Sequence, residues 1–146
     1  MPNTWIFQGN PKIWDVRAGV NQLETMNWGV RQFKNEIRLD DDVFIWISGR
    51  EAGIVALATV TSPPGEHVDS AAETALYPGG PPPKFRGKQL RVYLRIDKVL
   101  TRRITRLELL QHPTLSDLTV LTMPRGTNFR VSARQAQELR SIADER

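Results

Sequence analysis

Two apolar runs joined by a glycine-containing turn constrain the fold of this chain most strongly. The first run, VFIWIS, covers residues 43–48, and the second, IVALATVT, covers residues 54–61. Both have the length and the β-branched and aromatic content of strands. The connection at residues 49–53 contains two glycines, which suit a tight turn. The sequence therefore predicts a β-hairpin in the first half of the chain.

Signals on either side of the hairpin predict the other strands and a first helix. Asn10-Pro11 has the pattern of a helix N-cap followed by proline in the first turn, and apolar residues follow at helical spacing. Residues 89–100 alternate between apolar and polar side chains, which predicts a strand with one core face and one wet, basic face. Further strands are expected at residues 4–8, 118–123 and 128–131.

Two further helices and a long loop complete the expected fold. Thr105 with Glu108, and Ser132 with Gln135, have the spacing of capping boxes, which begin helices. Residues 62–83 are rich in proline and glycine and predict a long irregular loop, a kind of segment that is often functional. Hairpin-linked strands alternating with helices in this order predict an α+β fold, a small and strongly curved β-barrel with flanking helices.

The charge of the chain is uneven. Residues 1–83 carry six Lys/Arg and ten Asp/Glu, a net of −4, whereas residues 84–146 carry fourteen and six, a net of +8. The densest basic run comprises Lys84, Arg86, Lys88, Arg91, Arg95, Lys98, Arg102, Arg103 and Arg106. Such a field favours an anionic partner, most often a nucleic acid, with a merely solvated face as the alternative.

Most signatures of catalytic and metal sites are missing. Without cysteine the chain forms neither disulfides nor thiolate metal sites, and the common phosphate-binding, dinucleotide-binding and zinc-protease motifs are not found. His67, near Glu66 and Asp69, fits a solvated loop histidine better than a metal ligand. We expect a binding module with no cofactor and no metal rather than an enzyme. The N-terminal residues lack a signal-peptide pattern and no membrane-length apolar run is present, which favours a cytoplasmic location.

The four tryptophans differ in their surroundings. Trp5 and Trp46 lie inside predicted strands and are expected in the core. Trp14 is out of phase with the apolar stripe of the first helix, which suits the end of a barrel or the border of a site. Trp28 stands outside any apolar pattern, in a predicted loop near Arg31. A large ring with amides and cations nearby is what stacking on a nucleobase requires; core packing is the alternative for Trp28.

Three segments, taken in order, resemble the EVE family of the PUA-like superfamily, which also contains the YTH domains. They are TWIFQGNPKIWDV, NWGVRQFKNEIRLDDDVFIWISGREAGIVALATV and RGTNFRVSARQAQELRSI. The first is similar to the family's opening strand and capped turn, the second to its tryptophan loop and hairpin, and the third to its closing strand and final helix. The resemblance implies a single EVE/PUA-like domain over residues 1–146.

The resemblance also implies a reader of a modified base that is flipped into an aromatic cage, with DNA as the favoured nucleic acid. The base would be methylated or hydroxymethylated cytosine, or N6-methyladenine. Trp28 matches the cage tryptophan and Asn10 the polar residue after the first strand, and Gly29 would let the backbone approach the base. Tyr77 is the nearest candidate for the second wall, with Phe85 in reserve. The expected pocket comprises Trp28, Asn10, Gly29, Ser48, Tyr77 and Phe85.

Basic residues are expected to hold the sugar-phosphate backbone, because phosphate contacts position a nucleic acid whereas base contacts specify it. The family's usual Lys-Ser after the first strand is Gln8-Gly9 here, which removes one basic group near the pocket. The resemblance also implies a restriction nuclease as a partner. The residues expected to contact the nucleic-acid backbone are Arg31, Lys34, Lys84, Arg86, Lys88, Arg91, Arg95 and Arg130.

Three alternatives stay open. An RNA-binding PUA-like module acting on tRNA or rRNA would share the fold and would prefer RNA over DNA of the same sequence. A small hydrolase would resemble the related ASCH domains and would need a nucleophile, an acid or a metal in the pocket. An interaction module with an inactive pocket would block access to Trp28.

Overall fold

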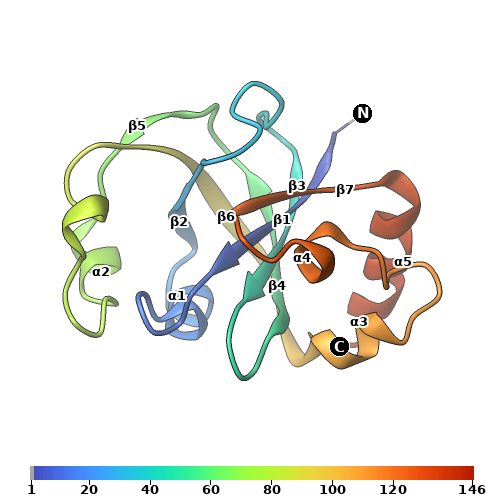
Figure 1. The fold of residues 1–146 in the computed structure, drawn as a ribbon. Coiled ribbons are helices and arrows are strands. Elements are labelled where there is room, and N and C mark those ends of the chain that lie inside the picture. The colour runs from blue at the N-terminus through green and yellow to red at the C-terminus, as the bar shows by residue number, and fades with distance from the viewer. Residues whose placement is uncertain (1) are drawn as a thin grey trace.

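A mixed, strongly curled sheet forms the centre of the fold (Figure 1). The structure is a computed structural model that describes residues 2–146. Strands pair in the order β2-β6-β4-β3-β1-β7, and β5 pairs with β6. The β1–β3 pair is parallel and the others are antiparallel. The strands are β1 (Thr4–Gly9), β2 (Thr25–Gly29), β3 (Asp42–Ile47), β4 (Gly53–Val60), β5 (Gly65–His67), β6 (Gln89–Thr105) and β7 (Asn128–Val131).

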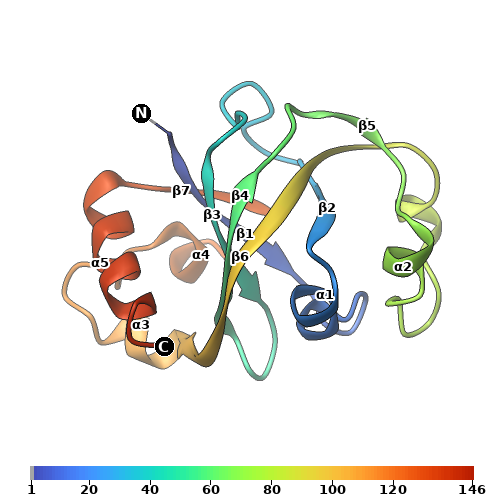
Figure 2. The same ribbon diagram turned by 180° about the vertical axis from the view of Figure 1, so that it is seen from behind.

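The helices lie in two groups at opposite sides of the sheet (Figures 1 and 2). One group, α3, α4 and α5, lies beside β7 and the C-terminus, and the other side carries α1 and α2. No helix within residues 2–146 has the length and apolar character that a membrane crossing requires. The helices are α1 (Val16–Gln22), α2 (Ala71–Thr74), the 3₁₀ helix η1 (Pro83–Phe85), α3 (Arg106–Leu110), α4 (Thr119–Thr122) and α5 (Ala133–Ala143).

The central strands β1 and β3 are buried on both faces, which explains why their sequences are almost continuously apolar. Phe7 and Ile45 belong to one core cluster, on the side of the sheet that faces α1. Ile6 and Trp46 belong to a second cluster, which includes Leu139 of α5. Alternation along each strand thus sends successive side chains into two separate cores.

Local sequence signals predicted the hairpin and two helix starts correctly. The hairpin is β3–β4, and the Thr105 and Ser132 capping boxes both form, at the starts of α3 and α5. Residues 38–41 form a turn that leads into β3. Within that turn the buried Asp41 carboxylate accepts hydrogen bonds from Trp5 Nε1, at 2.8 Å, and from the backbone N–H of Arg38, at 2.9 Å.

The first helix begins later than the sequence predicted. Its N-cap is Asp15, whose Oδ1 accepts a hydrogen bond from the N–H of Ala18. Asn10 instead begins a turn, and its Oδ1 accepts from the N–H of Lys12 at 3.0 Å. The prediction of Asn10 as a helix cap was therefore wrong, because the Asn-Pro pattern serves a turn equally well.

Two other segments also differ from expectation. Residues 118–123 were predicted as a strand, but they contain α4, whose Val120 and Leu121 are buried. Residues 62–83 are not an irregular loop, since they contain β5, α2 and the start of η1. We call residues 65–85 the arm. In Figures 1 and 2 its β5 and α2 lie on the side of the sheet away from α5.

Candidate functional site

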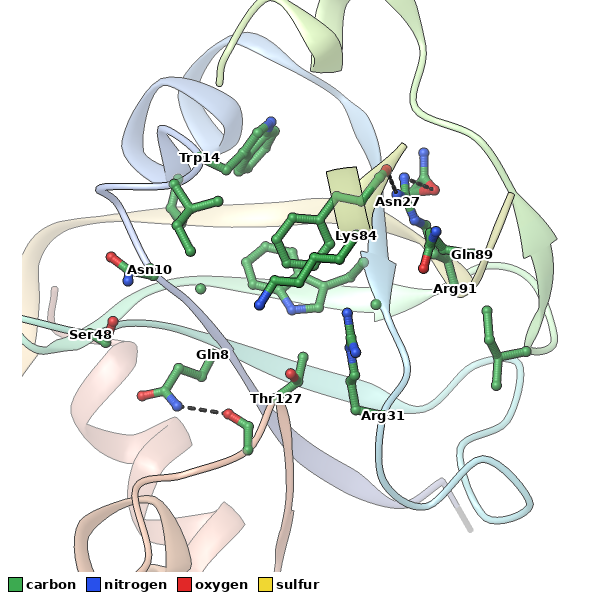
Figure 3. Close-up of a pocket in the computed structure, with 18 of the residues that line it drawn as sticks. Gln8, Asn10, Trp14, Asn27, Arg31, Ser48, Lys84, Gln89, Arg91 and Thr127 are labelled. Atoms are coloured by element: carbon green, nitrogen blue, oxygen red, sulfur yellow. Dashed lines mark hydrogen bonds between the residues drawn. The ribbon is translucent and has the colours of Figure 1, made fainter. Parts of the chain in front are cut away.

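A pocket of about 620 Å³ opens between the end of β1, the strand β2, the start of β6 and the arm (Figure 3). Its volume lies within the range of roughly 300–1,000 Å³ that is usual for ligand sites. The structure brings together at this pocket all six residues that the sequence assigned to base binding. They are Trp28, Asn10, Gly29, Ser48, Tyr77 and Phe85.

Trp28 lies at the floor of the pocket and is also part of the core. It is the fourth residue of β2, and its exposed fraction is 7%. The ring centroid of Trp28 is 6.5 Å from that of Phe7 and 6.3 Å from that of Trp14. The prediction that Trp28 lies in a loop was wrong, because β2 forms by pairing with the distant β6. Core packing, the alternative to base stacking for this residue, is therefore observed, and the same residue also lines the pocket.

Gly9 allows the end of β1 to lie against Trp28. A Cβ atom at Gly9 would stand 2.8 Å from Val16 Cγ2 and 3.0 Å from Trp28 Cζ2, closer than real side chains tolerate. Gly29, the residue that follows Trp28, differs from Gly9, because a Cβ atom at Gly29 would meet nothing within 4 Å. The close packing around Gly9 therefore requires a glycine, whereas the space beside Gly29 could accept a side chain.

The arm supplies an outer aromatic wall. Tyr77 and Phe85 are half-buried and line the pocket. The Tyr77 hydroxyl donates a hydrogen bond of 2.6 Å to Asp69 Oδ2. Burial and this hydrogen bond raise the pKa of Tyr77 above its ordinary value, so the hydroxyl stays neutral. Both rings of the wall are therefore uncharged, and the Tyr77 hydroxyl is held by its hydrogen bond to Asp69.

Glu73 ties the arm to β2. Its buried carboxylate accepts from the backbone N–H of Asn27, at 2.7 Å, and from Asn27 Nδ2, at 2.8 and 3.0 Å. The Glu73 carbonyl accepts from Trp14 Nε1 at 2.8 Å. Ser70 and Glu73 also form a capping box at the start of α2. The Ser-x-x-Glu spacing was present in the sequence and was the signal that would have revealed this helix.

Arg91 holds the arm from the side of β6. Its guanidinium pairs with Asp69 Oδ1, donates to Asn27 Oδ1 at 3.3 Å and to the Phe85 carbonyl at 3.0 Å. The residue is 5% exposed, so the prediction that it lies on the wet, basic face of β6 was wrong. The arm covers this face of β6 at Arg91. Through its contacts with Asp69 and the Phe85 carbonyl, the Arg91 guanidinium positions both residues.

Two cations stand at the mouth of the pocket. The Arg31 guanidinium carbon lies 5.5 Å, and Lys84 Nζ lies 5.1 Å, from the centroid of the Phe85 ring. Within residues 2–146 neither side chain hydrogen-bonds to another group. In the view of Figure 3, Asn10 and Ser48 lie on one side of the pocket and Arg31 on the other, with Lys84 between them. The mouth thus offers positive charge and polar groups to a ligand.

The other cations predicted to contact the nucleic-acid backbone lie outside the pocket lining. Arg95 is exposed and pairs with Asp97 at 2.8 Å. The Arg130 guanidinium stacks over the rings of Trp5 and Phe33, at 4.9 and 5.3 Å. Of the eight cations, Arg31, Lys84 and Arg91 are brought to the pocket. The residues that are exposed beyond it are Lys34, Arg86, Lys88, Arg95 and Arg130.

Several polar residues of the pocket were missed from the sequence. Asn27 and Asp69 hold the arm in place, and Gln8 and Thr127 line the rim opposite the arm. Their positions depend on strand pairings between distant segments, so no local pattern identified them. Within residues 2–146 no group of His, Asp and Glu side chains is arranged to hold a metal ion.

Comparisons with known proteins match the whole of this architecture. A sequence model of the EVE domain matches residues 3–142, and a search of curated protein sequences gave no match. A hypothetical protein from Leishmania major has a TM-score of 0.69 at 19% identity, with 99% of this chain and 96% of that one covered. Human THYN1, solved in complex with DNA containing 5-methylcytosine, has a TM-score of 0.68 at 17% identity, with 99% of each chain covered.

A third structural neighbour is a variant of an ASCH protein from Zymomonas mobilis. It has a TM-score of 0.59 at 11% identity, with 97% of this chain and 99% of that one covered. At such identities the likeness concerns the fold. It confirms the predicted PUA-like curved barrel with flanking helices.

Proposed function

This chain belongs to the EVE domain family, and from that premise we propose that its pocket binds a modified base flipped out of DNA. The base is methylated or hydroxymethylated cytosine, or N6-methyladenine. The observation that carries the proposal is a pocket with Trp28 at its floor, an aromatic wall at Tyr77 and Phe85, and two cations at its mouth that lie over the Phe85 ring. The DNA complex of the structural neighbour THYN1 supports the choice of nucleic acid.

The aromatic groups suit a planar base. Phe85 is half-buried and is flanked by Arg31 and Lys84, so a base entering the pocket meets a ring face and positive charge together. Stacking on an aromatic side chain contributes about 1–3 kcal/mol per base. Extrusion of a base from a duplex costs a few kcal/mol, so stacking and phosphate binding together offset that cost.

Polar groups of the pocket supply the recognition of the base edge. The Asn10 amide and the Ser48 hydroxyl lie at one rim, and Asp69 lines the wall. Both Asp69 oxygens already accept hydrogen bonds, from Arg91 and from the Tyr77 hydroxyl, so Asp69 positions the wall. Asn10 and Ser48 supply the hydrogen-bonding groups toward the base edge, and an asparagine can pair with adenine.

The modification itself contributes little free energy. Burial of one methyl group is worth about 0.8 kcal/mol, which corresponds to a factor of about four in affinity. Larger discrimination requires that the cage be closed around the methyl group. The anchoring of the arm by Glu73 and Arg91 supports such a closed geometry, because it fixes Tyr77 and Phe85 relative to β2.

A panel of labelled oligonucleotides tests the proposal. Fluorescence anisotropy would measure the dissociation constants of single-stranded DNA, duplex DNA and RNA of one sequence, with cytosine, 5-methylcytosine, 5-hydroxymethylcytosine, adenine or N6-methyladenine at one position. The proposal predicts tighter binding to one modified DNA than to its unmodified match. Equal affinities across the modifications would contradict it, and a consistent preference for RNA would favour the RNA-binding alternative.

Product analysis of the same mixtures tests the hydrolase alternative. Chromatography of the oligonucleotides after long incubation would reveal cleavage of a base, a phosphodiester or a modifying group. The proposal predicts that the oligonucleotides are recovered unchanged. A nuclease partner stays a prediction from the family resemblance.

A further inference from the structure

One rim of the pocket is formed by residues 123–127, Met-Pro-Arg-Gly-Thr, which connect α4 to β7. Pro124, Gly126 and Thr127 line the pocket. Met123 and Arg125 are exposed and do not belong to the lining. We call residues 123–127 the rim loop. The rim loop therefore contributes three residues to the pocket lining and leaves the side chains of Met123 and Arg125 exposed to solvent beside it.

Two glutamines fix the backbone of the rim loop. Gln8 Nε2 donates to the carbonyls of Pro124 and Gly126, at 2.9 and 2.8 Å. Gln32 Oε1 accepts from the N–H groups of Thr127 and Asn128, at 2.8 and 3.0 Å. Gly126 has a φ of 136°, which a residue with a Cβ atom rarely adopts. Hydrogen bonds thus hold the loop against the end of β1.

Met123 is an unusual residue to place on such a loop. It is 69% exposed, more than any other large hydrophobic side chain among residues 2–146. Its neighbour Arg125 makes neither a hydrogen bond nor an ion pair within the same residues. An exposed methionine contributes little to folding, whereas an unbranched apolar side chain adapts well to an irregular apolar surface.

We propose that Met123 enters the duplex at the space vacated by the flipped base, while Arg125 contacts a neighbouring phosphate. The inference rests on the proposed function. A flipped base leaves an unstacked apolar gap, and methionine is one of the side chains that proteins insert between base pairs. The gap must lie directly outside the pocket that holds the base. The rim loop borders the mouth of the pocket, and the hydrogen bonds from Gln8 and Gln32 hold its backbone in place.

Comparison of duplex and single-stranded DNA tests this role, because a single strand has no gap to fill. Dissociation constants would be measured for wild-type protein and for Met123→Ala with both forms of one oligonucleotide carrying the preferred modified base. Met123→Ala is expected to weaken duplex binding roughly tenfold, as expected for loss of a buried side chain of this size. Binding of the single strand is expected to change by less than about twofold.

Leu107→Ala is the matched control. Leu107 is 63% exposed on α3, at the other end of β6 from the pocket, so its loss is expected to change neither affinity. Met123→Leu, which keeps an apolar side chain of similar volume, is expected to restore most of the duplex affinity. Circular dichroism would establish that each variant is folded.

A fluorescent reporter gives an independent readout. 2-Aminopurine placed beside the modified base becomes bright when its stacking is disturbed, and Met123→Ala is expected to reduce the brightening at saturating protein. Unchanged duplex affinity in Met123→Ala, or an equal loss with duplex and single strand, would overturn the inference while leaving the base pocket intact. Failure of wild-type protein to distinguish modified from unmodified DNA in either form would overturn the proposed function as well.

Discussion

The indole of Trp14 stands nearly perpendicular to that of Trp28, with an interplanar angle of 80° and ring centroids 6.3 Å apart. Trp14 Nε1 also donates to the carbonyl of Glu73 in the arm. Trp14 therefore connects the floor of the pocket to its outer wall. This pair contributes both to the shape of the pocket and to the stability of the fold. Variants that test the site must therefore be chosen at positions where a substitution changes binding without changing stability.

Among the aromatic residues of the pocket, Phe85 is the one whose substitution is expected to change ligand affinity with the least effect on fold stability. Phe85→Ala is expected to weaken binding by about 1–3 kcal/mol, because the half-buried ring lies outside the core and is the proposed stacking surface for the base. The free energy of unfolding, measured with urea, is expected to change little. Trp28→Ala, in contrast, is expected to lower that free energy by about 3–5 kcal/mol. Full binding by Phe85→Ala would exclude Phe85 from the stacking wall.

Gly29 offers a way to fill the pocket without disturbing the fold. Gly29→Val adds a side chain where a Cβ atom meets nothing within 4 Å, and valine suits a strand. We expect unchanged or increased stability and a loss of base binding. Gly9→Ala is the matched comparison, since its Cβ would collide with Val16 and Trp28; it is expected to lower the melting temperature. A Gly29→Val protein that binds normally would place the ligand elsewhere.

Arg31 and Lys84 are expected to bind phosphate groups of the DNA. The double variant Arg31→Gln, Lys84→Gln should reduce the slope of log K against log salt by about 0.9 for each phosphate of duplex DNA that is no longer neutralised. The measurement is a salt titration with unmodified duplex. Arg102→Gln, Arg106→Gln is the control, because these exposed cations lie at the other end of β6. Equal changes in the two double variants would indicate a diffuse electrostatic effect rather than a track at the pocket mouth.

Arg91 is expected to act through the arm rather than through phosphate. Arg91→Gln leaves the Asp69 carboxylate without its buried partner, and loss of one member of a buried ion pair typically costs about 3–5 kcal/mol. We expect a large drop in the free energy of unfolding and increased protease cleavage within residues 65–85. A stable variant that loses only salt dependence would return Arg91 to the phosphate-binding role that its sequence position predicts.

The pair between Glu108 and Arg146 predicts a stability change in acid. Hydrogen bonds from Arg146 lower the pKa of Glu108 to about 2. A depressed pKa in the folded state stabilises the protein above the ordinary carboxyl value, and this contribution is lost as the pH falls toward 2. Glu108→Gln should therefore be less stable than wild type at pH 7 and approach it near pH 2, as measured by urea unfolding at each pH. A constant difference across this range would contradict the assignment.

Local patterns predicted part of the fold, and pairings between distant segments account for the rest. The β3–β4 hairpin and the helices at Thr105 and Ser132 depend on neighbouring residues, which a sequence shows directly. The strand β2 was missed because its burial comes from pairing with β6, far along the chain. Residues 118–123 contain β-branched and apolar side chains that favour a strand, yet tertiary packing stabilises α4 there.

The residues of the candidate pocket were predicted mainly from the family resemblance, and much less from local sequence patterns. Resemblance assigned Trp28, Asn10 and Tyr77 to one pocket, and the structure brings them together. Alternation along β6 placed Arg91 on a wet face, but the arm covers it. The hydrogen bonds that fix the arm, Asn27 with Glu73 and Arg91 with Asp69, join segments more than twenty residues apart, and nothing in their local sequence indicates the pairing.

The pocket above Trp28 is proposed to hold a modified base. The most direct test of this proposal is a titration of tryptophan fluorescence with matched duplexes that carry cytosine, 5-methylcytosine, 5-hydroxymethylcytosine, adenine or N6-methyladenine, using wild-type protein and Gly29→Val. Quenching is expected to saturate at lower DNA concentration for one modified duplex and to be absent in Gly29→Val. Quenching that is indifferent to modification, or that persists in Gly29→Val, would contradict the proposal.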